Sequence, residues 1–527
     1  MHPCLLVTEM LIRIIELVYE DDKRGTRDVA ALARTCRRFQ EPALEILWRT
    51  QRSLGPLIMC APEDLWGVGE DNIIFFKRTP VRSDWNRIMA NAPRIKHLGA
   101  NNPGLPRIQR LLPKINVDIL HSLLENCDMP SLLPSLSRLT FTSISGYRSV
   151  ADFFRYISPF LSPKLTYLSF HIPQEVDECE IDALIEQIPR KAPNIEQLCL
   201  SSCFRSHQVV LSLTTANLPY LRELTVNRFL SMSTRSIREL SSLRFFQDLS
   251  LSLKVSFDID KFVEGLDVHG SHGVFSTLRR IKFHTDTLLP CTSLFNLIQS
   301  DYLEEITVMV DEQQSASRVA DFLNALRQSS RVPSTLRSIC VRHNMQSSFS
   351  GDAPFIFNSS VFRPLLQFNK LKTIKFMNLG LYDLDDDFLS DAAMSWPDLE
   401  DFTFSRFPWS STRKVTLQGI LPLVSSCPNL YSLHITMDAT SVERTAEHKL
   451  GAGPVNHNLK TLNVGDSDIQ NPSDVAEFLF DIFPRLDMMF IHGGSIIFDR
   501  WQEVHSRMKQ MQVKAGYRSI EDDDTLF

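Results

Sequence analysis

The stretch Leu136-Ser137-Arg138-Leu139-Thr140-Phe141 follows the pattern Leu-x-x-Leu-x-Leu, in which other large apolar residues can replace a leucine. Copies of this pattern begin at Leu136, Leu165, Ile195, Leu221, Phe246, Leu278, Leu303, Leu336, Leu371, Leu399, Leu430, Leu459 and Leu486. Twelve intervals separate the first copy from the last, so the mean period is about 29 residues. One supersecondary unit is therefore repeated along most of the chain, and such units stack into an elongated fold.

Each copy of the pattern predicts a short β-strand, because apolar and polar residues alternate over its last four or five positions. The segments between copies have helical spacing, as between Val475 and Ile482, where Ser473 is the predicted N-cap and Pro472 blocks an earlier start. Alternating strands and helices require parallel strands with crossover helices. We therefore predict an α/β fold, a curved leucine-rich-repeat solenoid with strands on its concave side and helices on its convex side.

The first fifty residues do not follow this repeat and predict three short helices instead. Their apolar positions are Leu6, Met10, Ile14 and Leu17, widened by Leu11, Ile15 and Val18; then Leu32, Cys36 and Phe39; then Leu44, Leu47 and Trp48. The third helix is expected to begin near Pro42, because proline is well suited to a first helical turn. So small a helical module is close to the lower limit for a self-sufficient core, so part of its apolar surface is expected to meet a partner.

This N-terminal block resembles an F-box, and the whole chain resembles fungal F-box proteins in which leucine-rich repeats follow. The resemblance rests on residues 6–11 (LVTEML), 32–39 (LARTCRRF) and 43–48 (ALEILW). Val7 stands where the family usually has proline, and Phe39 where tryptophan is common. The resemblance implies a substrate-recognition subunit of a cullin–RING ubiquitin ligase. Its F-box would bind a Skp-type adaptor, and through it a cullin, while the repeats would hold a target protein.

The same resemblance implies the residues that would contact the adaptor, which are Leu6, Val7, Leu11, Ile15, Leu32, Cys36 and Phe39. Some of these residues could instead hold the three helices together. The alternative function is a leucine-rich-repeat interaction scaffold without a role in ubiquitin ligation. The expected domains are the F-box at 1–50, a connector and cap at 51–130, about thirteen repeats at 131–500, and a closing helix with an acidic tail at 501–527.

Composition and motifs exclude several other classes of function. The formal net charge is −6, so no general basic field is available for nucleic acid or anionic lipid, and no apolar run is long enough to cross a membrane. The ten cysteines are scattered, as in chains of a reducing compartment, so we expect the cytoplasm or the nucleus. Known catalytic motifs are missing, and His269 and His272 are too few to indicate a metal. We expect a non-catalytic protein without cofactor or metal.

Basic residues gather on the predicted solvent-facing side of the central strands. They are Lys254, Arg280, Lys282, His284, Arg342 and Lys375. One hypothesis is that they bind an acidic or phosphorylated segment of the target protein, because their donors pair strongly with carboxylate and phosphate oxygens. The alternative is an ordinary solvated surface, interleaved with Glu305 and Asp401, and this second interpretation is the one that charge patterns usually favour.

Overall fold

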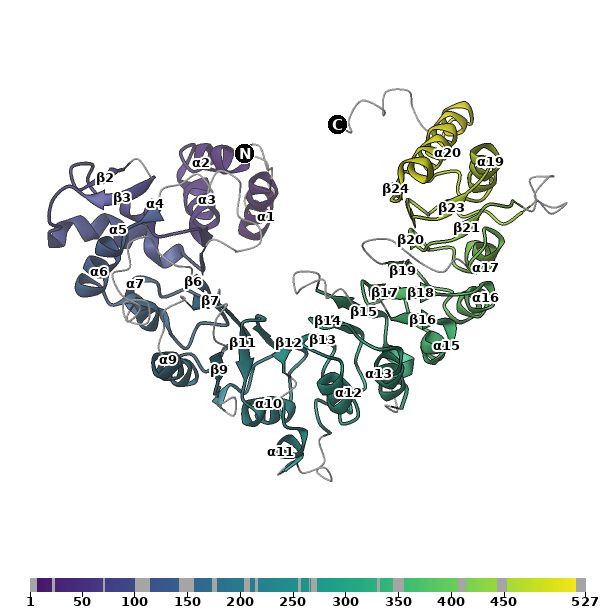
Figure 1. The fold of residues 1–527 in the computed structure, drawn as a ribbon. Coiled ribbons are helices and arrows are strands. Elements are labelled where there is room, and N and C mark those ends of the chain that lie inside the picture. The colour runs from purple at the N-terminus through teal and green to yellow at the C-terminus, as the bar shows by residue number, and fades with distance from the viewer. Residues whose placement is uncertain are drawn as a thin grey trace. The chain divides into compact units, whose positions relative to one another are not determined.

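The computed structural model describes the chain in the ranges 7–20, 24–69, 72–99, 114–141, 156–172, 178–202, 209–213, 217–254, 257–264, 266, 273–328, 332–344, 355–405, 414–442 and 453–517. The chain divides into two compact units, Met1–Phe246 and Gln247–Phe527. Each unit is α/β and is built on a sheet of parallel strands (Figure 1). This is the predicted fold class, with N-terminal helices followed by strands that alternate with helices.

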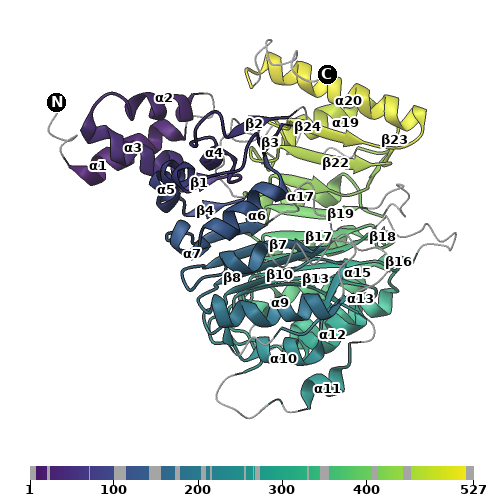
Figure 2. The same cartoon turned by 90° about the vertical axis from the view of Figure 1, so that its left-hand side faces the viewer.

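Three helices at the N-terminus pack against one another, as Figure 2 shows. They are α1 (Thr8–Tyr19), α2 (Gly25–Leu32) and α3 (Arg37–Arg49). Their core consists of Leu11, Ile15, Val29, Ala43 and Ile46, each at most 3% exposed. The apolar spacing of the sequence thus produces a helical module with a small core of its own.

The boundary between α2 and α3 differs from the prediction. A single helix through Leu32, Cys36 and Phe39 was expected, but α2 ends at Leu32 and Cys36 has extended backbone angles before α3 begins. The Thr35 hydroxyl donates to the Leu32 carbonyl at 2.8 Å, which closes the end of α2. Pro42 therefore lies inside α3 rather than at its start, so the predicted position of the third helix is also wrong.

The parallel sheet reaches further toward the N-terminus than the repeat pattern indicates. Helix α3 continues directly into β1 (Thr50–Gln51), which pairs in parallel with β4 (His97–Leu98). Strand β4 in turn pairs with β6 (Arg138–Phe141), the first strand of the regular pattern. The sheet of the first unit consequently begins at the residue that follows the three-helix module.

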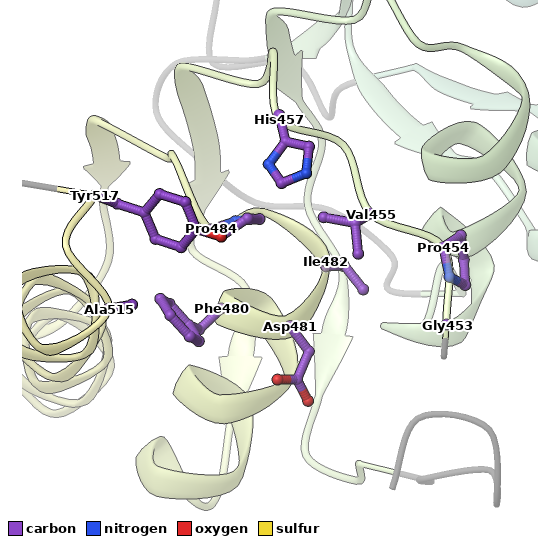
Figure 3. A pocket seen from close by; sticks show the side chains of 10 residues that line it. All are labelled: Gly453, Pro454, Val455, His457, Phe480, Asp481, Ile482, Pro484, Ala515 and Tyr517. Carbon is purple, nitrogen blue, oxygen red and sulfur yellow. The ribbon is translucent and has the colours of Figure 1, made fainter. Parts of the chain in front are cut away.

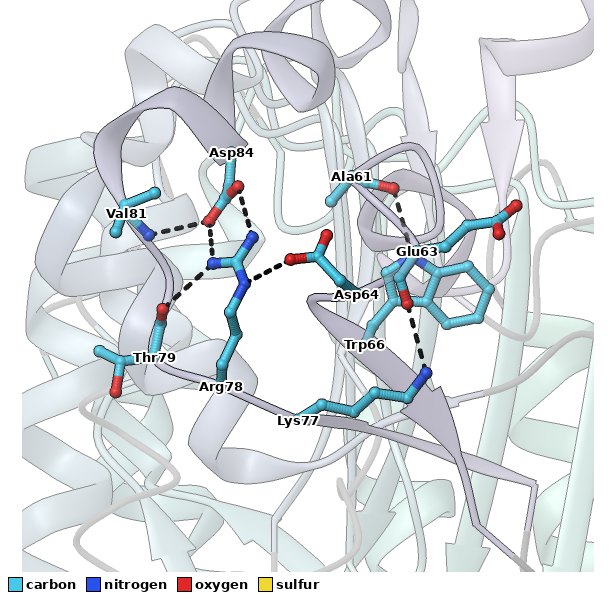
Figure 4. Close-up of polar contacts among 9 residues, drawn as sticks. All are labelled: Ala61, Glu63, Asp64, Trp66, Lys77, Arg78, Thr79, Val81 and Asp84. Atoms are coloured by element: carbon cyan, nitrogen blue, oxygen red, sulfur yellow. Dashed lines mark hydrogen bonds and ion pairs between the residues drawn. The ribbon is translucent and has the colours of Figure 1, made fainter.

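The segment between β1 and β6 adds a small layer of its own. Its elements are α4 (Gly55–Ile58), β2 (Trp66–Val68), β3 (Ile73–Phe76), α5 (Trp85–Asn91), β5 (Lys114–Ile115), α6 (Val117–Asn126) and α7 (Met129–Leu132). Arg78, just after β3, bonds the carboxylates of Asp64 and Asp84 and so joins the hairpin to the turn before α5 (Figure 4). The backbone N–H of Val81 also donates to Asp84, at 2.8 Å.

The regular repeats of the first unit hold their strands in register. Strand β6 is followed by β7 (Tyr167–Ile172), β8 (Gln197–Ser202) and β10 (Glu223–Val226), all parallel. A second short ladder joins β9 (Val209–Leu211) to β11 (Leu230–Met232). The helices of these repeats are α9 (Glu178–Lys191) and α10 (Thr234–Ser241).

The second unit contains nine parallel strands in an unbroken ladder among its described residues. These are β12 (Asp248–Leu253), β13 (Arg280–Thr285), β14 (Glu305–Val310), β15 (Ser338–His343), β17 (Thr373–Met377), β19 (Asp401–Ser405), β20 (Ser432–His434), β22 (Thr461–Gly465) and β24 (Met488–Ile491). Shorter parallel pairs join β16 (Ile356–Asn358) to β18 (Leu381–Asp383) and β21 (Asp438–Ala439) to β23 (Asp468–Ile469). Within this unit the strands line the inner side of a bend (Figure 1).

Helices cover the outer side of this bend. They are α11 (Ile259–Val263), α12 (Leu289–Phe295), α13 (Ala316–Gln328), α14 (Val332–Thr335), α15 (Ser359–Phe362), α16 (Asp386–Ser395), α17 (Leu421–Ser426), α19 (Pro472–Ile482) and α20 (Ser495–Lys514). Alternate strand residues point toward them, so that Ile281 and Phe283 are buried while Arg280 and Lys282 are exposed. The period-2 pattern therefore separates an apolar core from a polar strand face.

The start of α19 corrects one detail of the sequence analysis. Asn471, not Ser473, is the N-cap, and its side-chain oxygen accepts a hydrogen bond from the Ser473 N–H at 3.1 Å. Pro472 is the first helical residue rather than a block to the helix. Proline suits this position because its fixed φ angle matches the helix and the first N–H groups have no intrahelical partner.

Candidate functional site

One side of α1 presents apolar side chains to solvent. Val7, Met10 and Leu17 are 47%, 50% and 53% exposed, and Ile14 between them is half-buried. We call these four residues the α1 surface. Their spacing places them along one line of the helix, beside the face that fills the three-helix core. The helices pack without them, so the α1 surface is free to contact another molecule.

The predicted adaptor-contact residues fall into three groups. Leu6 lies outside the described residues, and Val7 belongs to the α1 surface. Leu11 and Ile15 are buried in the three-helix core, where they hold the module together. Leu32, Cys36 and Phe39 are half-buried, and Leu32 and Phe39 pack against the same core. The α1 surface also includes Met10 and Leu17. The helical spacing identifies these two residues, but the F-box resemblance did not imply them as adaptor contacts.

An ion pair joins α1 to α3. Arg49 Nη1 lies 2.8 Å from Glu16 Oε1, and this hydrogen bond lowers the pKa of the Glu16 carboxyl. Both side chains are partly buried, at 32% and 25% exposed. The pair joins the middle of α1 to the last residue of α3, so the α1 surface has a defined orientation relative to β1.

Most of the predicted basic residues on the strands of the second unit are already paired with carboxylates. Lys254 Nζ is 3.0 Å from Asp286, Lys375 Nζ is 2.8 Å from Asp401, and His284 Nε2 is 3.2 Å from Asp311. Arg280 bonds the Asp248 carboxylate of the neighbouring strand, with Nη2 at 2.9 Å. Lys254, Arg280 and Lys375 therefore alternate with carboxylates on this face, which we call the charge ladder, rather than forming a basic patch.

On this strand face, neighbouring groups favour the charged forms of Lys375 and Asp311. Burial opposes protonation of Lys375, but the hydrogen bond and charge of Asp401 outweigh it, so the pKa of Lys375 is raised. Burial likewise opposes ionisation of Asp311, but hydrogen bonds from His284 and Asn344 leave its pKa lowered. The remaining two basic residues, Lys282 and Arg342, are exposed and have no carboxylate partner in the described part of the chain.

A row of polar residues crosses the strand face of the first unit. The register aligns Thr50, His97, Arg138, Tyr167, Gln197 and Glu223, one each from β1, β4, β6, β7, β8 and β10. We call this set the Arg138 row. Thr50 Oγ1 and His97 Nδ1 are 3.1 Å apart, and the Gln197 amide donates to Glu223 at 2.9 Å. The row is half-buried throughout and begins at the residue that follows α3.

A pocket of about 290 Å³ lies near the end of the second unit (Figure 3). Its walls come from the loop before β22, the end of α19 and the residues after α20. They are Gly453, Pro454, Val455, His457, Phe480, Asp481, Ile482, Pro484, Ala515 and Tyr517. The ring of Tyr517 lies 6.4 Å from that of Phe480 and 6.5 Å from that of His457. This volume is small for an organic ligand.

No other site stands out in the described ranges. No three His, Cys, Asp or Glu residues there lie close enough to hold a metal ion, and His269 and His272 fall outside those ranges. None of the described helices combines the length and the apolar character that crossing a bilayer requires. The carboxylate of Asp385 accepts a hydrogen bond from the Phe388 N–H at 2.9 Å and caps α16, which is a structural role.

Comparison with known proteins finds likenesses among solved structures only. Neither a protein-family model nor a curated protein matches the sequence. Among solved structures, the chain is similar to a chain in the crystal structure of the Rad7 and Elc1 complex in yeast. The two chains share 14% sequence identity with a TM-score of 0.29, and the match covers 71% of this chain and 82% of that one. The fold described above rests on the structure of the chain itself.

Proposed function

We propose that this protein is a substrate-recognition subunit of a cullin–RING ubiquitin ligase. Helices α1 to α3 act as the F-box and bind a Skp-type adaptor, which joins them to a cullin, and the strand faces hold a target protein. The observation that carries the proposal is the α1 surface, because a module that closes its core still exposes Val7, Met10 and Leu17. Exposed apolar residues gathered on one helix are typical of a protein-binding site.

The proposed role is non-catalytic. The strand faces offer ion pairs, amides and hydroxyls spread over many strands. Extended polar faces of this kind suit the binding of a protein segment. Location in the cytoplasm or the nucleus remains a prediction, as do the domain limits at residues 50, 130 and 500.

The alternative is an interaction scaffold that has lost contact with the ubiquitin system. Val7 favours it, because it stands where the F-box family usually has proline. In the structure Val7 is the N-cap of α1 and contributes no side-chain hydrogen bond to the helix start. Valine can be accommodated there without disturbing α1, so this substitution alone does not remove the α1 surface.

Binding to a purified Skp-type adaptor tests the proposal directly. The intact chain should form a complex with the adaptor that elutes as one species in size-exclusion chromatography and captures a cullin. Met10→Asp and Leu17→Asp should weaken adaptor binding about tenfold or more, because each places a charge in an apolar contact. Both residues are exposed, so the free chain should remain folded.

Met394→Asp is the matched control. Met394 lies on α16 in the second unit and is 71% exposed, so this variant adds the same charge at an exposed methionine elsewhere. It should bind the adaptor as the parent does. Failure of the intact, folded chain to bind the adaptor would favour the scaffold function instead. Equal binding by the Met10→Asp, Met394→Asp and parent chains would show that the adaptor does not bind at the α1 surface.

A further inference from the structure

Arg138 is held in one position by two neighbouring strands. Its guanidinium carbon lies 3.9 Å from the centre of the Tyr167 ring, which is a close cation–π contact. Its Nη1 reaches beyond the ring and donates to Gln197 Oε1 at 3.2 Å. The guanidinium is therefore fixed over β7, and its Nε and Nη2 donors make no further contact with the described residues.

The other cations near the Arg138 row already have carboxylate partners. Lys96 Nζ is 2.9 Å from Glu45, and Arg49 Nη1 is 2.8 Å from Glu16. Arg138 forms no ion pair with any described residue, although its side chain is half-buried. A partly buried charge without a counter-ion has lost hydration without gaining an opposite charge, so an incoming anion would stabilise it.

The histidine next to Arg138 in the row adds no positive charge of its own. Burial lowers the pKa of His97, and the positive charges of Arg138, Arg49 and Lys96 lower it further. His97 is therefore neutral at physiological pH and can offer its ring as a hydrogen-bond partner without adding charge. The first carboxylate along the row, Glu223, is separated from Arg138 by the Gln197 amide.

We propose that the Arg138 row binds one carboxylate side chain from an extended acidic segment of the target protein. The guanidinium of Arg138 receives the carboxylate on its free edge, and Tyr167 and Gln197 hold the guanidinium in place. This inference deepens the proposed function, on which it rests, because it names the chemistry of the target. It also places the recognised side chain near β7, on the sheet that begins with β1 at the end of the three-helix module.

The number of free charges favours a carboxylate over a phosphate. A guanidinium fork matches the two oxygens of a carboxylate, and one cation balances its single negative charge. A phosphate carries close to two negative charges at neutral pH and is usually bound by several cations. The additional cations nearest to Arg138 are neutralised by Glu45 and Glu16. A glutamate or aspartate side chain therefore fits the site better than a phosphorylated residue.

Selection from a library of random displayed peptides, with the intact chain bound to its adaptor as bait, tests the proposal. Peptides selected by the parent chain should share an aspartate or glutamate at one position, and this preference should disappear with Arg138→Gln as bait. Arg280→Gln is the matched control, because Arg280 is an exposed strand arginine that is already bonded to Asp248. It should select the same acidic peptides as the parent.

Affinity measurements then test whether Arg138 and the acidic residue of the peptide contact each other. We expect Arg138→Gln to lower the affinity for the best selected peptide about tenfold, as measured by fluorescence anisotropy. Replacing the acidic residue of the peptide by glutamine should weaken binding to the parent equally but leave binding to Arg138→Gln unchanged. This cycle remains informative when Arg138→Gln lowers stability, because the peptide variants report on the folded parent alone.

Three results would overturn the inference: no acidic preference on the parent, an equal preference on Arg138→Gln, or tighter binding of a phosphoserine peptide than of the glutamate peptide to the parent. Adaptor binding is measured separately with the α1 variants. Arg138→Gln should leave adaptor binding unchanged, so a failed peptide test with an intact adaptor complex rejects this inference alone. Loss of adaptor binding by the parent rejects the proposed function itself.

Discussion

Arg78 holds the Asp84 carboxylate with two parallel hydrogen bonds, from Nη1 to Oδ2 at 2.7 Å and from Nη2 to Oδ1 at 3.0 Å. The Nε of the same guanidinium donates to Asp64 at 2.7 Å. Asp84 is almost completely buried, whereas Asp64 is exposed. One arginine therefore connects the residue before β2, the end of β3 and the turn before α5, in the layer that lies between β1 and β6.

This contact predicts an acid-dependent stability. Hydrogen bonds from Arg78 and from the Val81 N–H lower the pKa of Asp84 from about 3.8 to about 2. A lowered folded-state pKa contributes stability that is present above the unfolded value and is lost as the pH falls through about 2. Asp84→Asn should therefore lower the thermal midpoint of the parent chain near neutral pH, and this difference should shrink below about pH 4.

Thermal unfolding followed by circular dichroism across this pH range checks the prediction. Glu63→Gln is the control, since Glu63 is exposed in the same segment and its side chain makes no ion pair with described residues. It should leave the midpoint nearly unchanged at every pH. A difference between the parent and Asp84→Asn that stays constant down to about pH 2 would contradict the assigned role of the carboxylate.

Truncating a side chain should lower stability strongly in the three-helix core but only slightly on the α1 surface. Leu11→Ala should destabilise the module by about 2–5 kcal/mol, because it leaves a cavity among Ile15, Val29 and Ala43. Leu17→Ala should change stability by less than about 0.5 kcal/mol, because Leu17 is 53% exposed. Hydrogen exchange of α2 and α3 measures both effects, and equal protection in the two variants would show that Leu11 is not a core residue.

Charge reversal should distinguish Arg280 of β13, which is paired with a carboxylate, from Lys282, which is not paired with one among the described residues. Arg280→Glu sets a carboxylate between those of Asp248 and Glu305, which occupy the same register position on the adjacent strands. Like charges in such positions destabilise a sheet, by about 0.2–1 kcal/mol per pair. Lys282→Glu lies beside Ser250 and Thr307 and should cost less. Urea unfolding of the two variants measures the difference, and the reverse order of stability would contradict the observed pairing.

The N-cap of α19 gives a fourth test. Asn471→Ala removes the side-chain acceptor that bonds the Ser473 N–H and should lower stability by about 1 kcal/mol. Ser473→Ala should have a smaller effect, since its hydroxyl receives only a long contact of 3.3 Å from Arg507. Urea unfolding of both variants decides between the two caps. A larger loss for Ser473→Ala would favour the cap expected from the sequence.

The repeat was predictable because its side-chain periods are strict. Alternation at residues such as Ile281 and Phe283 determines which side of each strand is buried. The structure has a strand at each of the thirteen predicted positions, and each strand starts two residues after the first residue of the pattern. Strands β1 and β4 escaped notice because they have only two residues each, although Ile95 and Leu98 preserve the start of the pattern. The start of α3 was missed because Pro42 is tolerated inside it.

The candidate sites were only partly predictable. The helical spacing of Met10, Ile14 and Leu17 identifies the α1 surface, but only packing shows that Leu11 and Ile15 are enclosed. Arg280 of β13 and Lys375 of β17 could be placed on one face, yet their carboxylate partners lie on neighbouring strands about thirty residues away. The Arg138 row was not proposed, because the contact of Arg138 with Gln197 spans two repeats and depends on side-chain conformation.

The direct passage from Arg49 at the end of α3 to Thr50 at the start of β1 leaves no spacer between the three helices and the first strands. If the helices bind the ligase as proposed, a target protein bound on this sheet is held at a distance from the ligase that is set by folded structure rather than by a flexible linker. The position of each lysine on the bound target protein would then decide whether it can be ubiquitinated. Inserting glycine and serine residues between Arg49 and Thr50 would allow more of the target's lysines to be ubiquitinated.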